Sequence, residues 1–123
     1  IYVEDHCNGL LSIYKKGNAG ESYNIGTNVN VNNLNLTKLL LKIIKNKKIR
    51  IGKKVKIKFV KDRPGHDFRY ALNSKKIRAE LNWRPKKNFK KGLEETFDWY
   101  VKNYGFFNTF SKNKFFKRLG LKL

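Results

Sequence analysis

Apolar residues at helical spacing are the main pattern in this sequence, and only a few short runs have the pattern of strands. From Leu36 onward they recur at i, i+3, i+4, i+7 and i+8, which predicts an amphipathic helix that begins near that residue. A second stripe predicts a long helix after Asn88 and contains Leu93, Phe97, Tyr100, Val101 and Tyr104. Two short runs, SYNIG at 22–26 and VKIKFV at 55–60, have strand character. Strands this few and short do not form a self-contained α/β sheet. We therefore expect a subdomain that packs against a larger partner domain.

Local signals predict the elements of the N-terminal part. Residues 1–4 resemble the end of a strand, and Asp5 is placed to cap the helix that follows. The inward face of that helix is predicted to carry Leu10, Leu11 and Tyr14. Gly17 is expected to end it. In the short strand that comes next, Tyr23 and Ile25 share one side.

Capping residues predict where the two later helices begin. Asn73 or Ser74 is expected to cap a short helix whose Ile77 and Leu81 face inward. Asn88 is expected to cap the last long helix. The overall pattern is therefore one of helices alternating with a few short strands.

The length and the first residues suggest a piece of a longer protein. The 123 residues suffice for one small domain, include no Met, and begin with IYVEDH, which reads like the middle of a strand and its exit. We therefore expect a fragment or a processed piece. Within it we expect residues 1–104 to form one subdomain and residues 105–123 to form a basic, aromatic C-terminal tail.

Cysteine and histidine usage excludes several classes of site. The single cysteine, Cys7, rules out an internal disulfide framework, and we expect it to be a small buried hydrophobe. His6 and His66 lie far apart in the sequence, without a Cys/His cluster that would predict a metal site. The longest apolar window is too short and too rich in lysine to span a membrane, and no signal-peptide pattern is present. We expect a cytoplasmic protein.

The charge of the chain allows two interpretations. The formal net charge is +20, which favours contact with polyanions such as nucleic acid. Lysine greatly outnumbers arginine, however, and the lysines are spread along the whole chain. A nucleic-acid module concentrates its charge or interleaves it with aromatic residues. A solvated lysine surface is therefore the favoured interpretation, with no specific nucleic-acid partner.

One loop concentrates groups that suit anion recognition. It reads DRPGHDFR from residue 62 to residue 69. Pro64 fixes one backbone angle and Gly65 permits unusual ones, so the chain can turn sharply there. Arg63 offers a planar fork for a phosphate, and His66 can donate or accept near neutral pH. The alternative is a surface turn whose Asp62–Arg63 and Asp67–Arg69 pairs satisfy each other; the residues alone leave both interpretations open.

Recognised catalytic motifs are absent from the sequence. There is no G-x-G-x-x-G turn and no Walker loop. Ser22, His66 and Asp67 supply the residue types of a hydrolytic triad, but no nucleophile-elbow sequence supports that arrangement. We predict no catalytic residue in this chain.

An ordered series of motifs resembles the C-terminal part of the dTDP-glucose 4,6-dehydratase family, within the extended short-chain dehydrogenase/reductase superfamily. The motifs are YVEDHC, GESYNIG, NNLNL, DRPGHDFRYALNSKKIRAELNWRP and FKKGLEETFDWY, which run from residue 1 to about Tyr104. The resemblance implies an α/β fold, namely the C-terminal substrate-binding portion of a Rossmann-type enzyme with most of the Rossmann core missing. It also implies that residues 1–104 form a nucleotide-sugar-binding subdomain.

The same resemblance implies the substrate-binding residues. They are Asn33, Asp62, Arg63, Pro64, Gly65 and His66, and the residue that approaches the pyrophosphate is Arg63. Phe68 stands where the family often has a second arginine. In the family, both the part that binds NAD and the proton-transfer residues would lie N-terminal to residue 1.

The implied function is the substrate side of an NAD-dependent lyase that converts dTDP-glucose to dTDP-4-keto-6-deoxy-glucose. We expect the chain to be inactive alone and the full-length parent to be a homodimer. The first alternative is another nucleotide-sugar epimerase, dehydratase or decarboxylase of the superfamily. A basic nucleic-acid-binding module is the second and less favoured alternative.

Overall fold

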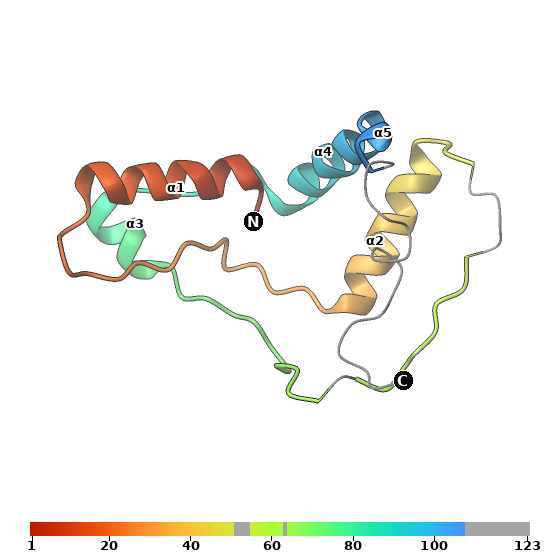
Figure 1. Cartoon of the computed structure of the whole chain (residues 1–123), viewed down its shortest axis with the longest axis horizontal. Helices are drawn as coiled ribbons and strands as arrows, with labels where there is room; N and C mark the ends of the chain where they lie inside the picture. Colours follow the sequence, from red (N-terminus) through yellow and green to blue (C-terminus); the bar gives the residue numbers. More distant parts are fainter. Residues whose placement is uncertain (51–54, 63, 108–123) are drawn as a thin grey trace.

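The structure, a computed structural model, is built from helices joined by long irregular segments (Figure 1). It describes residues 1–50, 55–62 and 64–107. The helices are α1 (Val3–Lys16), α2 (Asn33–Asn46), α3 (Lys75–Leu81), α4 (Phe89–Lys102) and α5 (Tyr104–Phe107). The expected C-terminal tail, 105–123, lies mostly outside the described residues.

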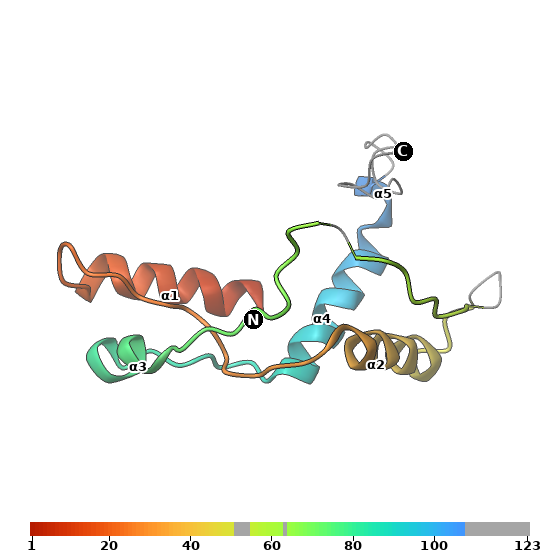
Figure 2. The ribbon, with the colours of Figure 1, turned by 90° about the horizontal axis from the view of Figure 1, so that it is seen from below.

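The main core lies where α1 packs beside α3, at one end of the molecule (Figure 2). Its buried residues are Ile25, Ile77, Leu81 and Trp83, with Ile13 and Tyr23 packed against them. Ile77 and Leu81 therefore face inward, as their spacing predicted. The side chain of Ser74 is fully buried as well, and its Oγ donates to the carbonyl of Gly26 at 3.1 Å. This bond fixes the start of α3 against the segment that follows α1.

The other end of the molecule holds α2, α4 and α5 (Figures 1 and 2). An ion pair between the Lys47 ammonium and the Asp98 carboxylate, 2.7 Å apart, links the end of α2 to α4. Ile43 is buried on the predicted apolar stripe of α2. On α4 the predicted stripe is only partly covered, because Tyr100 and Val101 remain exposed. Tyr104, which was predicted to continue this stripe, is exposed and begins α5 instead.

The arrangement is open. The accessible surface of the chain is 11092 Å², against about 6,900 Å² for a compact monomer of this mass. Long stretches of the chain therefore cover little of one another.

The expected strands do not form in the described residues. Residues 3 and 4 already belong to α1, and residues 22–26 and 55–60 have no regular structure. A strand needs a hydrogen-bonded neighbour, and none of the described segments pairs with these runs. The side preference was nevertheless correct in the first run, where Tyr23 and Ile25 both reach the core. In the second run Phe59 is 85% exposed, so its alternating pattern has no packing partner here.

The predicted face of the first helix is wrong, although the helix itself is confirmed. Its predicted inward residues, Leu10, Leu11 and Tyr14, are exposed. The packed face instead carries Asp5 and Gly9, with Ile13 beside the core. Helical spacing of large apolar residues missed this face because its central residue, Gly9, has no side chain. The expectation that Gly17 ends the helix is confirmed.

Helix starts follow the predicted capping chemistry in part. The Asn88 side chain caps α4 by accepting from the Lys91 amide at 2.9 Å, as expected. Asn32 caps α2 in the same way, so that helix begins three residues before the predicted Leu36. Ser74 precedes α3 but makes no capping bond, since its hydroxyl donates to the Gly26 carbonyl. Asn73, the other predicted cap, accepts from the Lys75 amide at 3.0 Å.

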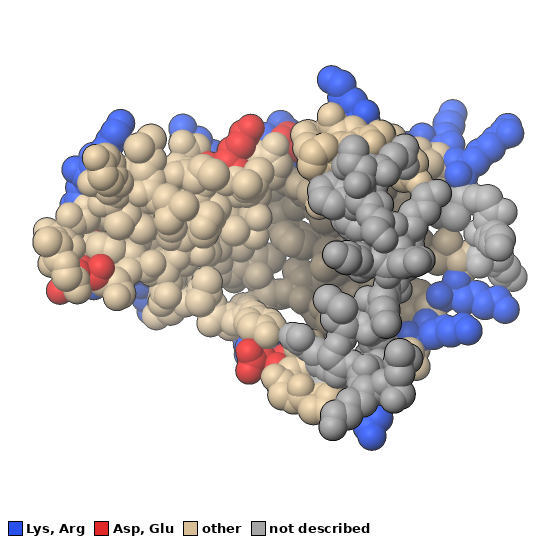
Figure 3. Space-filling model, in the orientation of Figure 1, with Lys and Arg blue, Asp and Glu red and all other residues tan. Residues whose placement is uncertain are grey.

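The surface of the molecule carries basic side chains and an exposed cysteine. Lys and Arg side chains project at both ends of the visible face (Figure 3). Cys7 is exposed, so the expectation of a buried cysteine is wrong; its side chain lies on α1 away from the packed face. None of the described helices combines the length and hydropathy needed to cross a membrane.

Candidate functional site

The Pro-Gly loop forms a turn that ties a carboxylate to an imidazole. Gly65 has a φ of +71°, in the left-handed region that favours glycine. The turn brings Asp62 and His66, four residues apart, into contact: Nδ1 of His66 lies 2.7 Å from Oδ2 of Asp62. The ring of Tyr70 lies near the imidazole, with centroids 6.4 Å apart. The loop therefore presents a defined Asp–His pair.

The self-paired alternative for this loop can be tested only for Asp67 and Arg69, because the Asp62–Arg63 pair involves a residue outside the described ones. Asp67 and Arg69 form no ion pair among the described side chains. Asp62 is engaged by His66. Arg63 lies outside the described residues, so its expected phosphate contact stays a prediction.

Asn33 lies apart from this loop along the chain, as the first residue of α2. Its carbonyl accepts from the Thr37 hydroxyl at 2.8 Å. No hydrogen bond or ion pair in the described part of the chain joins Asn33 to Asp62 or His66. The structure thus brings Asp62, Pro64, Gly65 and His66 together in one turn, while Asn33 belongs to a separate element.

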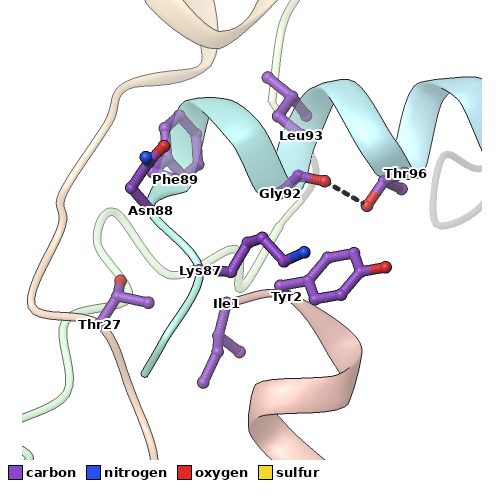
Figure 4. A pocket seen from close by; sticks show the side chains of 9 residues that line it. All are labelled: Ile1, Tyr2, Thr27, Lys87, Asn88, Phe89, Gly92, Leu93 and Thr96. Carbon is purple, nitrogen blue, oxygen red and sulfur yellow. Dashed lines mark hydrogen bonds between the residues drawn. The ribbon is translucent and has the colours of Figure 1, made fainter. Parts of the chain in front are cut away.

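A small pocket of about 200 Å³ opens between the beginnings of α1 and α4 (Figure 4). Its lining residues are Ile1, Tyr2, Thr27, Lys87, Asn88, Phe89, Gly92, Leu93 and Thr96. None of the predicted substrate-binding residues is among them. Several of its polar side chains already bond within the chain: Thr96 donates to the Gly92 carbonyl, and Asn88 caps α4. The pocket is therefore mainly an apolar recess.

Lys87 and Glu95 form an ion pair beside this recess, and each residue shifts the pKa of the other. The Lys87 ammonium lies 2.7 and 2.9 Å from the two oxygens of Glu95. The hydrogen bond from Lys87 lowers the pKa of Glu95, and the same bond raises the pKa of Lys87. Partial burial and the nearby Glu4 and Glu95 raise the pKa of Tyr2, whose ring lies under the Lys87 ammonium. The group stabilises the junction of α1 and α4.

Sequence reasoning missed the residue that holds this junction. Asp5 was expected to cap the first helix, but it lies inside α1 and is only 5% exposed. Its two carboxylate oxygens accept from the backbone amides of Lys86 at 3.0 Å and Lys87 at 2.9 Å. An acidic residue near a helix start is the signal for a cap, and nothing in the sequence points to partners 80 residues away.

The described residues do not fit a dinucleotide cofactor or a metal ion. Binding of NAD in a Rossmann fold uses a glycine-rich turn between a strand and a helix, and the sequence has no such turn. Among residues 1–50, 55–62 and 64–107 there is also no cluster of three His, Cys, Asp or Glu side chains. The Asp–His loop carries groups that suit hydrogen bonding to a polar ligand, and substrate binding there stays a prediction.

Comparisons with known proteins point to one enzyme group. A family model described as GDP-mannose 4,6 dehydratase matches residues 1–96. A dTDP-glucose 4,6-dehydratase from Haemophilus influenzae is 41% identical over 110 residues, which are 84% of this chain and 32% of that protein. The chain spans about a third of the length of the curated relatives it matches.

Solved structures give the same result. The crystal structure of dTDP-glucose 4,6-dehydratase from Bacillus anthracis in complex with NAD matches with a TM-score of 0.74 and 36% identity, over 87% of this chain and 32% of that one. DesIV, a dTDP-glucose 4,6-dehydratase from Streptomyces venezuelae with NAD and TYD bound, matches with a TM-score of 0.70 and 38% identity, over 84% and 30%. These are Rossmann-type enzymes, so the coarse fold assignment and the family resemblance are confirmed.

Proposed function

The chain belongs to the GDP-mannose 4,6-dehydratase family, and from this membership we propose that it forms the substrate-side part of an NAD-dependent dTDP-glucose 4,6-dehydratase. The observation that carries the proposal is the identity of 36–41% with curated dTDP-glucose 4,6-dehydratases over 84% of the chain. The Asp62–His66 contact supports it, because it holds the imidazole in a defined position within the loop that the resemblance assigns to substrate binding.

The role proposed for the chain is binding and orientation of the nucleotide sugar. Arg63 meets the pyrophosphate, His66 and Asn33 add polar contacts, and Pro64 with Gly65 shapes the turn. NAD supplies oxidation at C4 of the sugar and the later reduction at C6 in this reaction class, and a different part of the parent protein binds it. The chain contributes no proton-transfer residue, so its effect on the reaction comes through substrate affinity and position.

Binding of dTDP-glucose to the 123-residue chain, followed by calorimetry, tests this role. A guanidinium can meet two phosphate oxygens at once, whereas a lysine meets them as a point charge. Arg63→Ala should raise the dissociation constant on the order of 10- to 150-fold, from a charge-assisted bond of about 1.5–3 kcal/mol. Arg63→Lys should fall between the parent and the alanine variant. Unchanged affinity in a folded Arg63→Ala chain would contradict the assignment.

The proposal also predicts that the chain alone does not catalyse the reaction. Its sequence lacks both the glycine-rich dinucleotide turn and the Tyr-x-x-x-Lys pair of the superfamily. Incubation with dTDP-glucose and NAD should give no 4-keto-6-deoxy product above a no-protein control. Turnover above that control would contradict the proposal that this chain only binds the substrate while another part of the parent protein carries out the chemistry.

Two finer features go with the proposal. The parent is a cytoplasmic protein and a homodimer, and sedimentation of the full-length protein would test the dimer.

The rival assignment to GDP-mannose has its own support, since the matching family model carries that name. Titration with GDP-mannose beside dTDP-glucose distinguishes the two, and the proposal expects tighter binding of dTDP-glucose.

A further inference from the structure

The contact between Asp62 and His66 determines which nitrogen of the imidazole is free. Oδ2 of Asp62 lies 2.7 Å from Nδ1, within hydrogen-bond distance. An ionised carboxylate has acceptors only, so Nδ1 must carry the hydrogen. The remaining nitrogen, Nε2, has no hydrogen bond among the described residues. The His66 side chain keeps 29% of its surface exposed, so a ligand can reach the ring.

We propose that Asp62 is a positioning residue, which holds His66 as the Nδ1–H form and so presents Nε2 to the diphosphate of the nucleotide sugar. This inference rests on the proposed function and assigns Asp62 a different role from direct substrate contact. A phosphate oxygen requires a donor, so Nε2 takes up a proton when the ligand binds. The Asp62 carboxylate then balances the charge of the imidazolium.

Two neighbouring features agree with this role. Pro64 and Gly65, which has a φ of +71°, lie between the two residues whose carboxylate and ring meet. The Tyr70 ring lies near the imidazole and is tilted by 54° to it. Tyr70 follows His66 in the sequence, whereas Asp62 precedes it. Asp67, the next acid in the loop, makes no ion pair or hydrogen bond with His66 among the described contacts, which makes it a matched control.

Nitrogen-15 spectroscopy of the imidazole rings tests the first half of the proposal without any ligand. The chain has two histidines, so His66→Gln assigns both ring systems and His6 serves as an internal reference. In the neutral ring of His66 we expect protonated Nδ1 and unprotonated Nε2. Asp62→Asn should remove this preference, because an amide can donate to Nδ1, while Asp67→Asn should leave it. A His66 ring protonated on Nε2 in its neutral form, or an equal effect of Asp67→Asn, overturns the proposal.

Titration with dTDP tests the second half. We expect the Nε2 resonance to move toward the protonated position as dTDP binds. Asp62→Asn should weaken dTDP binding about threefold to tenfold, and Asp67→Asn less than twofold. In the His66→Gln background, Asp62→Asn should have no further effect, because it acts through the ring.

The outcomes separate this inference from the proposed function. If dTDP binds and leaves the His66 resonances unmoved, or if the two substitutions act additively, the positioning role is overturned and the proposed function stands. If dTDP and dTDP-glucose fail to bind the folded chain, the proposed function is contradicted. In that case the phosphate contact of His66 falls with it, whatever tautomer the ring adopts.

Discussion

Gly9 is buried where α1 packs against Ile25 and Trp83. A β-carbon built there would lie 2.9 Å from Cγ2 of Ile25 and 3.2 Å from Cε2 of Trp83. The first distance is shorter than real β-carbon contacts, so any side chain at this position forces its neighbours to move. The small residue is what allows α1 to lie against the segment at Ile25 and the connector at Trp83.

Gly9→Ala should therefore destabilise the chain by about 1–3 kcal/mol, the range for overpacking a well-filled core. The matched control is Gly105→Ala, because a β-carbon at Gly105 meets nothing within 4 Å. Urea unfolding followed by circular dichroism measures both. Equal stability of the two variants would show that α1 is not held against Ile25 and Trp83 in solution.

The Lys87–Glu95 pair predicts how stability depends on pH. The pKa of Glu95 is lowered, so its contribution is present above the unfolded value of about 4.3 and is lost as the pH falls through the folded value. The pKa of Lys87 is raised, so its contribution is lost only as the pH rises beyond about 10.4.

Glu95→Gln should consequently lower the melting temperature by a few degrees at pH 7, and the difference from the parent should vanish near pH 3. Raised salt should shrink it at pH 7, because both side chains are partly exposed. Thermal melts at matched ionic strength measure this. A difference that persists unchanged in acid would mean that Glu95 acts by packing instead of charge.

Among the elements, helices α1 to α4 were predicted from the sequence, whereas α5 was not and the predicted strands do not form in the described residues. Helix α4 has a capping asparagine, Asn88, and apolar spacing that act locally, so its range could be predicted. The run 55–60 has the right alternation for a strand, but a strand depends on a partner that no local pattern supplies. The contact of Asp62 with His66 was not predicted, although the two residues are only four positions apart, and the distant amide partners of Asp5 were missed as well.

The link between α1 and the start of α4 depends on Asp5. Asp5→Ala should speed hydrogen exchange at the amides of Lys86 and Lys87, which donate to its carboxylate. Loss of hydrogen bonds to a charged acceptor should also cost about 1.5–3 kcal/mol of stability. Glu4→Ala, one residue earlier and exposed, is the control and should leave both amides unchanged. Unchanged exchange in Asp5→Ala would show that the link does not persist in solution.

At the scale of the whole molecule, the open arrangement predicts uneven protection. The amides of residues 22–26 and 55–60 donate no backbone hydrogen bond in the described structure. Their hydrogens should exchange rapidly, while α2 and α4 should hold the most protected amides. Strong, uniform protection across both runs would reveal a self-sufficient sheet and contradict the picture of a subdomain that leans on a larger partner.

The same open arrangement explains why the residue patterns alone did not identify the fold or the function. Both were inferred from the resemblance to a known family. The chain buries few apolar side chains of its own, and Val55, Ile57 and Phe59 remain exposed. Alternating runs such as residues 55–60 therefore resemble strands that have no pairing partner among the described residues. The large positive charge does not identify a partner either, and tight nucleic-acid binding that persists at physiological salt would be needed to revive that alternative.

The central claim is that this chain forms the nucleotide-sugar-binding part of a dTDP-glucose 4,6-dehydratase. The most direct measurement is made on a chimera of the Haemophilus influenzae relative in which this chain replaces the matched segment. The account predicts that the folded chimera, loaded with NAD, converts dTDP-glucose to the 4-keto-6-deoxy product, and that Arg63→Ala in the chimera weakens substrate binding on the order of 10- to 150-fold. A folded chimera that holds NAD and fails to bind dTDP-glucose would contradict it.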